Sequence, residues 1–262
     1  MTSRLLPVRA LAPVLLCIAL IPDAGADLTL TGRSTVMSMG IPVIGQETLL
    51  FKGARLRRDV VDRGRAYSYI YDPAARQVAV LDHVLHLAEI HSMRTLAGET
   101  EGKINSQRMK LTTTPTGRTQ KLQSWNCAEH DLSIVMPAQL GNEPVTLTLS
   151  GHIWLARKVA EQSEIAALLK VAESPDFFIG IPAFARASPA QAGAFSEALT
   201  RIAPMGMLCA AEVEARYEGT GPLVELARRV GTRIGINFEQ FNTDALKDES
   251  FIVPANYRVI HR

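Results

Sequence analysis

The stretch that decides the fold reads VTLTLSGHIWL and spans residues 145–155. Its odd positions carry aliphatic residues or glycine, and its even positions carry mainly polar ones. Successive side chains of a strand point to opposite faces, so this period of two predicts a strand with one apolar face. Residues 205–218 repeat the pattern from Met205 to Tyr217. We therefore expect long strands in a sheet with one apolar and one polar face.

Weaker alternation runs through eight further segments of the chain. They are residues 28–39, 45–52, 54–62, 66–71, 77–87, 109–114, 120–136 and 232–241. Turn residues separate several of them, at Asp72-Pro73, at residues 114–117 and at residues 219–222. About ten successive strands with polar faces predict one large curved antiparallel sheet.

Residues 161–204 interrupt this pattern. Residues 163–172 are rich in Ala, Leu and Glu and predict a helix, and Ser188 begins a second one as its N-cap, with Pro189 in the first turn. We also expect a short helix over residues 90–97. An apolar concave sheet face must be covered, and helices are the available cover. The expected fold is an α+β open half-barrel, with helices over its concave face, in one domain over residues 27–262.

The first 26 residues have the pattern of a secretory signal peptide. Arg4 and Arg9 precede an apolar run over residues 10–21, and the small residues 24–26 close the segment. That run is about a dozen residues, whereas roughly 20 are needed to cross a bilayer. We expect cleavage after Ala26, a periplasmic mature protein and no transmembrane segment after cleavage.

Composition narrows the class of protein. The chain has 262 residues, a formal net charge of +2 and 47% hydrophobic residues, which excludes a disordered chain and gives no basic excess for a nucleic-acid partner. It has no Gly-rich phosphate loop and no serine nucleophile elbow, so we expect no cofactor and no catalytic residue. His83 and His86 would face opposite ways on a strand, so we expect no metal site.

Cys127 and Cys209 are the two cysteines that remain after cleavage. An oxidising compartment favours a disulfide between them. Two buried free thiols, or a reactive Cys127 beside His130, are the alternatives. The last is disfavoured because positions 127 and 130 of a strand point to opposite faces.

Three phrases carry a family resemblance. They read GRTQKLQSWNC at residues 117–127, IWLA at 153–156 and FIVPANY at 251–257. In order and spacing they resemble an exported family of unknown function that is similar to the periplasmic lipoprotein carriers and outer-membrane receptors of the LolA/LolB kind. The resemblance implies a half-barrel with helices on its concave side and a capacity to hold acyl chains. It implies no catalytic residue, because the carriers are not enzymes.

The apolar segment at residues 175–184 is the candidate lid over such a cavity. It is either a lid or core that connects helices. The expected ligand-binding residues are four from this segment and four from the strands: Phe177, Phe178, Ile181, Phe184, Leu149, Ile153, Met207 and Val213.

A basic stretch at residues 52–65 contains Lys52, Arg55, Arg57 and Arg58. It is either a site for anionic headgroups or a solvated hairpin with Asp59 and Asp62 as local partners.

The expected function is non-catalytic binding of lipid or lipoprotein acyl chains, with lipid or an acylated protein as partner. One alternative is a structural or protein-interaction module whose own helices fill the concave face. The other is a hydrolase whose site forms only in three dimensions. The sequence leaves the oligomeric state open.

The export pattern predicts the first residue of the mature protein. N-terminal sequencing of protein recovered from the periplasm should begin at Asp27. A mature protein that retains Met1, or that begins at Cys17, would contradict cleavage after Ala26.

Overall fold

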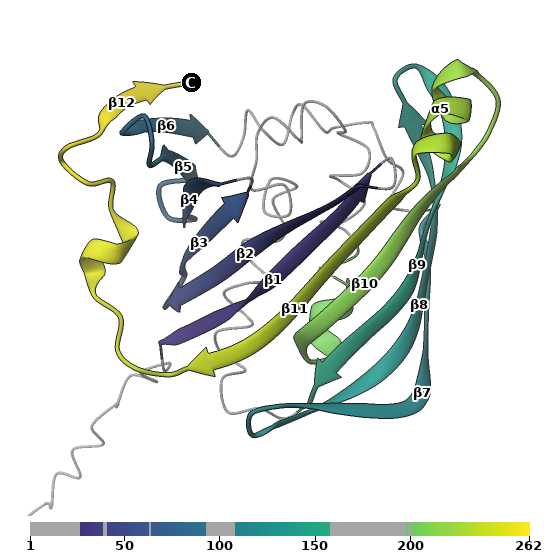
Figure 1. Ribbon diagram of the computed structural model, residues 1–262, viewed down its shortest axis with the longest axis horizontal. Coiled ribbons are helices and arrows are strands. Elements are labelled where there is room, and N and C mark those ends of the chain that lie inside the picture. Colours follow the sequence, from purple (N-terminus) through teal and green to yellow (C-terminus); the bar gives the residue numbers. More distant parts are fainter. Residues whose placement is uncertain (1–26, 39–40, 63, 93–107, 158–197, 199–200) are drawn as a thin grey trace, which may run out of the picture.

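The computed structural model describes residues 27–38, 41–62, 64–92, 108–157, 198 and 201–262. Twelve strands of this part form one sheet in the order β12-β6-β5-β4-β3-β2-β1-β11-β10-β9-β8-β7 (Figure 1). Neighbouring strands are antiparallel except β12, which runs parallel to β6. The strands are β1 Leu28–Ser38, β2 Ile41–Lys52, β3 Arg55–Asp62, β4 Arg65–Asp72, β5 Gln77–Asp82, β6 Leu87–Ser92, β7 Lys110–Leu122, β8 Trp125–Leu140, β9 Glu143–Ala156, β10 Met207–Glu218, β11 Thr232–Asn242 and β12 Arg258–His261; the helices are α5 Pro222–Val230 and the 3-10 turns Ala203–Met205 and Asp248–Phe251.

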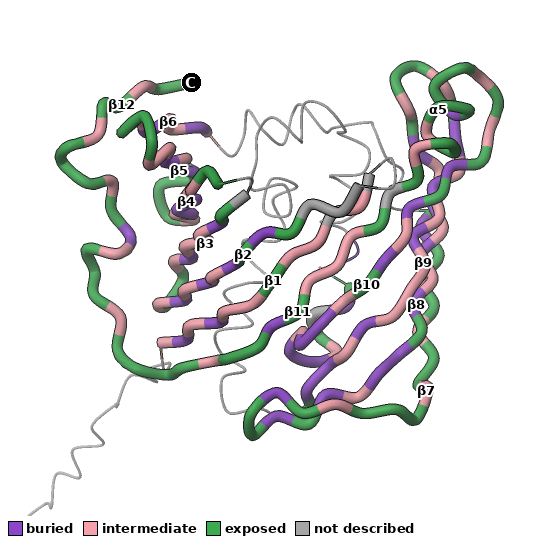
Figure 2. Tube along the Cα trace, viewed as in Figure 1, coloured by how far each residue is buried: buried purple, intermediate pink, exposed green. Residues whose placement is uncertain are grey.

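β9 contains the stretch from which the fold was predicted, and its alternation is confirmed. Val145, Leu147, Leu149, Ile153 and Leu155 are all buried. β9 lies between β8 and β10 and pairs with both along its length. Figure 2 shows buried positions recurring along these three strands.

Two of the predicted strands are each divided by a hairpin turn. Residues 77–87 form β5, a turn and the first residue of β6, which pairs with β5 as an antiparallel hairpin. The strand breaks because the Asp82 carboxylate accepts hydrogen bonds from the backbone N–H groups of Val84 and Leu85, at 2.9 and 3.0 Å. This side-chain turn competes with a continued strand. Residues 120–136 likewise turn at Gln123, whose φ is 50°. The helix predicted over residues 90–97 is wrong for Ile90 to Ser92, which belong to β6.

The predicted α+β half-barrel of about ten strands, with helices over the concave face, is also wrong for the described residues. They form twelve strands, and α5, the α-helix that is described from end to end, lies at the end of β10 instead of covering the face (Figure 1). The count rises from ten to twelve because the turn after Asp82 separates β6 from β5, and because β12 adds a strand that the sequence did not predict. The helix predicted at residues 163–172 lies outside the described residues. Of the helix predicted from Ser188, Ala198, Arg201 and Ile202 are described and are helical, and Ala198 and Ile202 are buried.

Helix α5 formed where the sequence predicted only a turn. Pro222 is compatible with its first turn, and Val224 is fully buried. The Glu143 carboxylate, at the start of β9, accepts hydrogen bonds from the Leu223 and Val224 N–H groups at 3.5 and 3.3 Å. A distant side chain therefore satisfies the exposed donors of the first turn.

Cross-strand neighbours identify one face of the sheet as apolar. Ile236 of β11 and Ala211 of β10 are direct partners and so share a face. Ile236 packs against a buried cluster centred on β1–β4, which we call cluster 1, and Ala211 packs against one centred on β8–β10, which we call cluster 2. We call the face that joins these partners the inner face and the opposite face the outer face.

A disulfide joins Cys127 of β8 to Cys209 of β10, which confirms the first of the three states considered for these residues. Their Cα atoms are 6.3 Å apart, and 82 positions separate them in sequence. Cys127 pairs with Ala156, the last residue of β9, and Cys209 sits in a register shift between Leu208 and Ala210. The bond therefore ties the two neighbours of β9 together where β9 ends.

The chain after β11 crosses the outer face of the first strands, and we call residues 244–257 the strap (Figure 1). Lys52 Nζ donates to the Leu246 carbonyl at 2.6 Å, and Arg57 Nη1 donates to the Ser250 carbonyl at 2.9 Å. Hydrogen bonds from Arg55 and Lys52 lower the pKa of Asp248. Three residues of the basic stretch thus hold the protein's own C-terminal segment.

Hydrogen bonds through Tyr257 and Arg258 fix the end of the strap. The Tyr257 hydroxyl lies 2.6 Å from His83 Nδ1, and His83 Nε2 lies 2.6 Å from Ser68 Oγ. Arg258 N donates to the His86 carbonyl at 2.9 Å, where β12 begins beside β6. The FIVPANY phrase is therefore a structural closure of the sheet edge.

Two glycines allow neighbouring strands to approach closely. A Cβ atom on Gly151 of β9 would lie 1.9 Å from the Glu212 carbonyl oxygen of β10, and one on Gly32 of β1 would lie 2.2 Å from the Asn237 carbonyl oxygen of β11. The lack of a side chain at Gly151 makes room for the backbone of β10.

We expect Gly151→Ala to destabilise the protein by about 1–3 kcal/mol or more, because the added methyl group meets backbone that cannot rotate away. Gly235→Ala is the matched control, since its nearest atoms would be 3.7 Å away. Urea unfolding of both variants measures the difference. Equal stability of the two variants would contradict the close approach.

Candidate functional site: the inner face of the sheet

The inner face of β8, β9 and β10 is built from matching apolar rows. Leu149 pairs with Ile134 on one side and Ala215 on the other, and all three are buried. Leu149, Ile153 and Val213 of the expected site belong to cluster 2. The structure therefore brings these three residues onto one surface, as the alternation predicted.

Met207 does not join them and packs in cluster 1. The register shift at Cys209 interrupts the alternation of β10, so residues on either side of it no longer keep one period. Phe177, Phe178, Ile181 and Phe184 lie outside the described residues, and the structure neither supports nor opposes a lid there.

The inner face of β1 to β5 carries larger side chains. Leu28, Phe51, Leu56 and Tyr71 form one cross-strand row, and each is at most 1% exposed. Trp125, at the tip of the β7–β8 hairpin, stacks on Phe241 with ring centroids 4.1 Å apart. This hairpin tip therefore meets the end of β11.

A charged pair lies within this apolar surface. Arg58 Nε and Nη2 donate to the two carboxylate oxygens of Glu47, each at 2.8 Å. The Glu47 side chain is 1% exposed and the Arg58 side chain is 18% exposed. Two parallel bonds to one carboxylate are the strongest geometry that an arginine offers.

Apolar neighbours surround the guanidinium group. Arg58 pairs across the sheet with Leu49 of β2 and Tyr69 of β4, both buried. Burial acts to lower the pKa of Arg58, but the charge of Glu47 and the hydrogen bonds to it raise this pKa above its ordinary value. Arg58 is therefore a permanent cation on the inner face.

The structure divides the basic stretch between the two faces. Arg55 and Arg57 lie on the outer face and hold the strap. Arg58 follows Arg57 in the sequence, and its side chain lies on the inner face. The role of Glu47 was not predicted from the sequence. The alternation of Leu56, Arg58 and Val60 with Arg57 and Asp59 places Arg58 on the apolar face, but its partner follows only from the register of β2 on β3.

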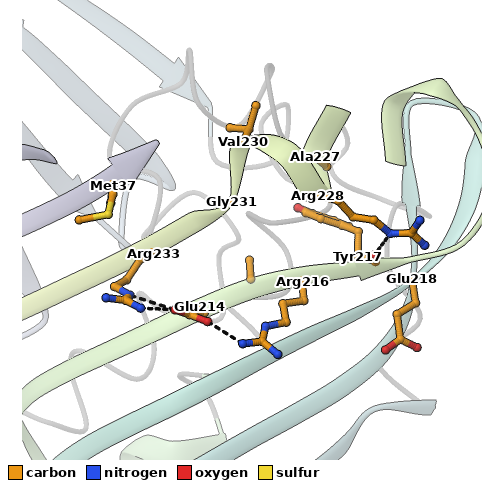
Figure 3. Close-up of a pocket in the computed structure, with 11 residues that line it drawn as sticks. Met37, Glu214, Arg216, Tyr217, Glu218, Ala227, Arg228, Val230, Gly231 and Arg233 are labelled. Carbon is orange, nitrogen blue, oxygen red and sulfur yellow. Dashed lines mark hydrogen bonds and ion pairs between the residues drawn. The ribbon is translucent and has the colours of Figure 1, made fainter. Parts of the chain in front are cut away.

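A separate pocket of about 450 Å³ opens where β10 and β11 diverge beside α5 (Figure 3). Strand pairing stops at Ala215 and Thr232. Arg228 donates from Nε to the Tyr217 carbonyl and from Nη2 to the Gly219 carbonyl. The residues that line the pocket are Met37, Glu214, Ala215, Arg216, Tyr217, Glu218, Ala227, Arg228, Val230, Gly231 and Arg233.

The charges of this pocket interact with one another. Arg233 and Arg216 both donate to Glu214, and these bonds lower the pKa of its carboxyl group. The pocket walls are thus rich in paired charges. They do not match the apolar ligand that the sequence resemblance implies.

A polar cluster occupies β8 and β9 near the disulfide. The buried carboxylate of Glu129 accepts hydrogen bonds from Arg118 and Thr116, and His152 Nδ1 lies 2.8 Å from Asp131 Oδ1. Within the described ranges, no three His, Cys, Asp or Glu side chains are grouped to hold a metal ion. In the same part of the chain, no helix has the length and apolarity to cross a bilayer.

Comparison with known proteins gives no family assignment. No protein family matches the chain, and no curated protein matches its sequence. Among solved structures, an outer membrane lipoprotein-sorting protein domain from Vibrio parahaemolyticus is similar with 8% identity and a TM-score of 0.33, covering 87% of this chain and 90% of that one. PNGF-II has 8% identity and a TM-score of 0.24, covering 90% of this chain and 31% of that one. Likeness at this level carries no conclusion about function.

The buried pair predicts an asymmetric effect on stability. Glu47→Gln should lower the free energy of unfolding by roughly 3 kcal/mol, because it leaves the Arg58 charge without its counterion. The double variant Glu47→Leu with Arg58→Met should lie close to the wild type, because it removes both desolvated charges and keeps the volume.

Urea unfolding of the wild type, Glu47→Gln and the double variant measures this asymmetry. A double variant as unstable as Glu47→Gln would show that the loss comes from packing and not from the unpaired charge.

Proposed function

We propose that the protein is exported, cleaved after Ala26, and binds a hydrophobic ligand on the inner face of its sheet without catalysis. The mature chain, residues 27–262, acts as one domain in the periplasm. The ligand is lipid or the acyl chains of a lipoprotein, so its partner is a lipid or an acylated protein.

One observation carries this proposal: clusters 1 and 2 adjoin on the inner face, through Ile236 and Ala211. The sheet is a single layer whose edge strands are β12 and β7. Among the described residues no second sheet covers this apolar face, so the face must meet another apolar body. An acyl chain fits such a surface because the hydrophobic effect depends on the apolar area removed from water and needs no directional contact.

The disulfide supports export. Bonds between cysteines persist in oxidising compartments, and Cys127 and Cys209 are joined. The apolar run in residues 10–21 and the small residues before Asp27 support a cleaved signal.

The burial of the inner face favours a second candidate, a structural or protein-interaction module with a self-filled core. Leu28, Leu147 and Leu155 are fully buried. A filled interior and a ligand site make opposite predictions about bound lipid.

Lipid extraction of natively purified protein, followed by mass spectrometry, distinguishes the two. A ligand-binding protein should carry an acyl species at near-stoichiometric level, or should bind a fluorescent polyene fatty acid after lipid removal. Absence of lipid together with no binding of the fatty acid would establish the self-filled core instead.

Paired substitutions locate the binding surface. Val213→Thr puts a hydroxyl on the inner face at unchanged size and should weaken fatty-acid binding several-fold. Val84→Thr is the matched control, because Val84 is 59% exposed in the β5–β6 turn. Equal affinity of both variants would place the ligand elsewhere.

A further inference from the structure

We propose that Arg58 is the polar anchor of the inner face and binds the carboxylate of a long-chain fatty acid, with Glu47 as the residue that positions it. This inference rests on the function proposed above and specifies the ligand class for the same surface.

The first support is the geometry of the guanidinium group. Arginine has five N–H donors, and the bonds to Glu47 use one on Nε and one on Nη2. Glu47 thus engages one edge of the planar fork. The other edge, formed by Nη1 and Nη2, has the same two-donor geometry that matches a carboxylate.

The second support is the difference in burial within the pair. Glu47 is 1% exposed, whereas 18% of the Arg58 side chain remains accessible. Glu47 is the more buried member of the pair, and the Arg58 guanidinium is the more exposed one. Glu47 therefore fixes the orientation of Arg58, and an arriving group meets the cation first.

The third support is the surface around the pair. Leu30, Leu49 and Tyr69 stand in the same cross-strand row as Arg58. A ligand with its anionic group at Arg58 would lay its chain over these buried apolar side chains. This arrangement fits an amphiphile with one charged end, and not a purely hydrocarbon ligand.

The charge balance selects a monoanion. Glu47 already neutralises Arg58, so a bound carboxylate leaves one net negative charge, and a dianionic phosphate monoester would leave two. Charge that is uncompensated on an apolar surface is costly, so the smaller excess is favoured. Among anionic ligands, a free fatty acid leaves the smallest excess, since it carries a single charge.

The test compares the binding of one acyl chain with and without a charged carboxylate at its end. The probes are cis-parinaric acid and its methyl ester, which share the same fluorescent chain, titrated into delipidated protein at low ionic strength. The wild type should bind the acid about tenfold or more tightly than the ester, because a hydrogen-bonded charge pair adds to the shared apolar contact.

The double variant Glu47→Leu with Arg58→Met removes the charges and keeps the apolar surface. It should bind the ester as the wild type does and should lose the preference for the acid to within twofold. Arg57→Met is the control, because Arg57 faces the strap and should leave the preference intact.

The outcomes separate the two proposals. If neither probe binds the wild type, the proposed function fails. If both probes bind the wild type with equal affinity, or if the double variant keeps the preference for the acid, the role of Arg58 is overturned while hydrophobic binding stands. Circular dichroism melting of each variant, run beside the titration, shows that the protein measured is folded.

Discussion

The structure depends on one constraint: a single layer of sheet with an apolar face has to remove that face from water. A flat layer would leave clusters 1 and 2 in contact with solvent. The close approach of β9 to β10 at Gly151, and of β1 to β11 at Gly32, brings neighbouring backbones together on this sheet. Register shifts at Thr31/Gly32 and at Leu208/Ala210 accompany them. Glycines and bulges of this kind introduce curvature, and curvature turns an apolar face into an enclosed one.

The outer face of β4 to β6 carries a smaller apolar cluster of its own, in which Ile70 and Leu81 are buried together with Phe251 of the strap, and polar contacts surround it. Lys52 and Arg57 bind carbonyl groups of the strap, and His83 joins Ser68 to Tyr257. The strap leads into β12, and Arg262, the residue after β12, donates to Glu89 of β6 and lowers the pKa of that carboxyl group. Because the pKa of Glu89 is lower in the folded protein, its bond to Arg262 stabilises the fold at any pH above the pKa of the unfolded chain. This stabilisation is lost as the pH falls through the folded pKa, so the contact between the C-terminal end and β6 weakens in acid. The C-terminal segment is thus fastened to the outer face by polar contacts and by the apolar cluster that it covers.

Local alternation was sufficient to predict β9 and most of β10, because each keeps one buried face over many residues. It failed at Asp82, where a side chain forms the turn, and at Cys209, where one extra residue ends the period. It also missed β12, because each residue of β12 pairs with a residue of β6 that lies 171 positions earlier (258 − 87), and no local pattern records such a pairing. For the candidate site, alternation found Leu149, Ile153 and Val213, while the pairing of Glu47 with Arg58 needed the register of β2 on β3.

That register follows from a two-residue turn at Gly53 and Ala54, which places Lys52 opposite Arg55 and therefore Leu49 opposite Arg58. Glu47 then lies on the same face as Arg58, two residues farther along β2, within reach of a diagonal contact. A slip of one residue would send Arg58 to the outer face and bury Arg57 in its place. The ion pair is thus compatible with only one pairing of these strands. A hydrophobic pair would cover the same surface at less desolvation cost, so a charged pair retained at this position is better explained by selection of register, of ligand, or of both.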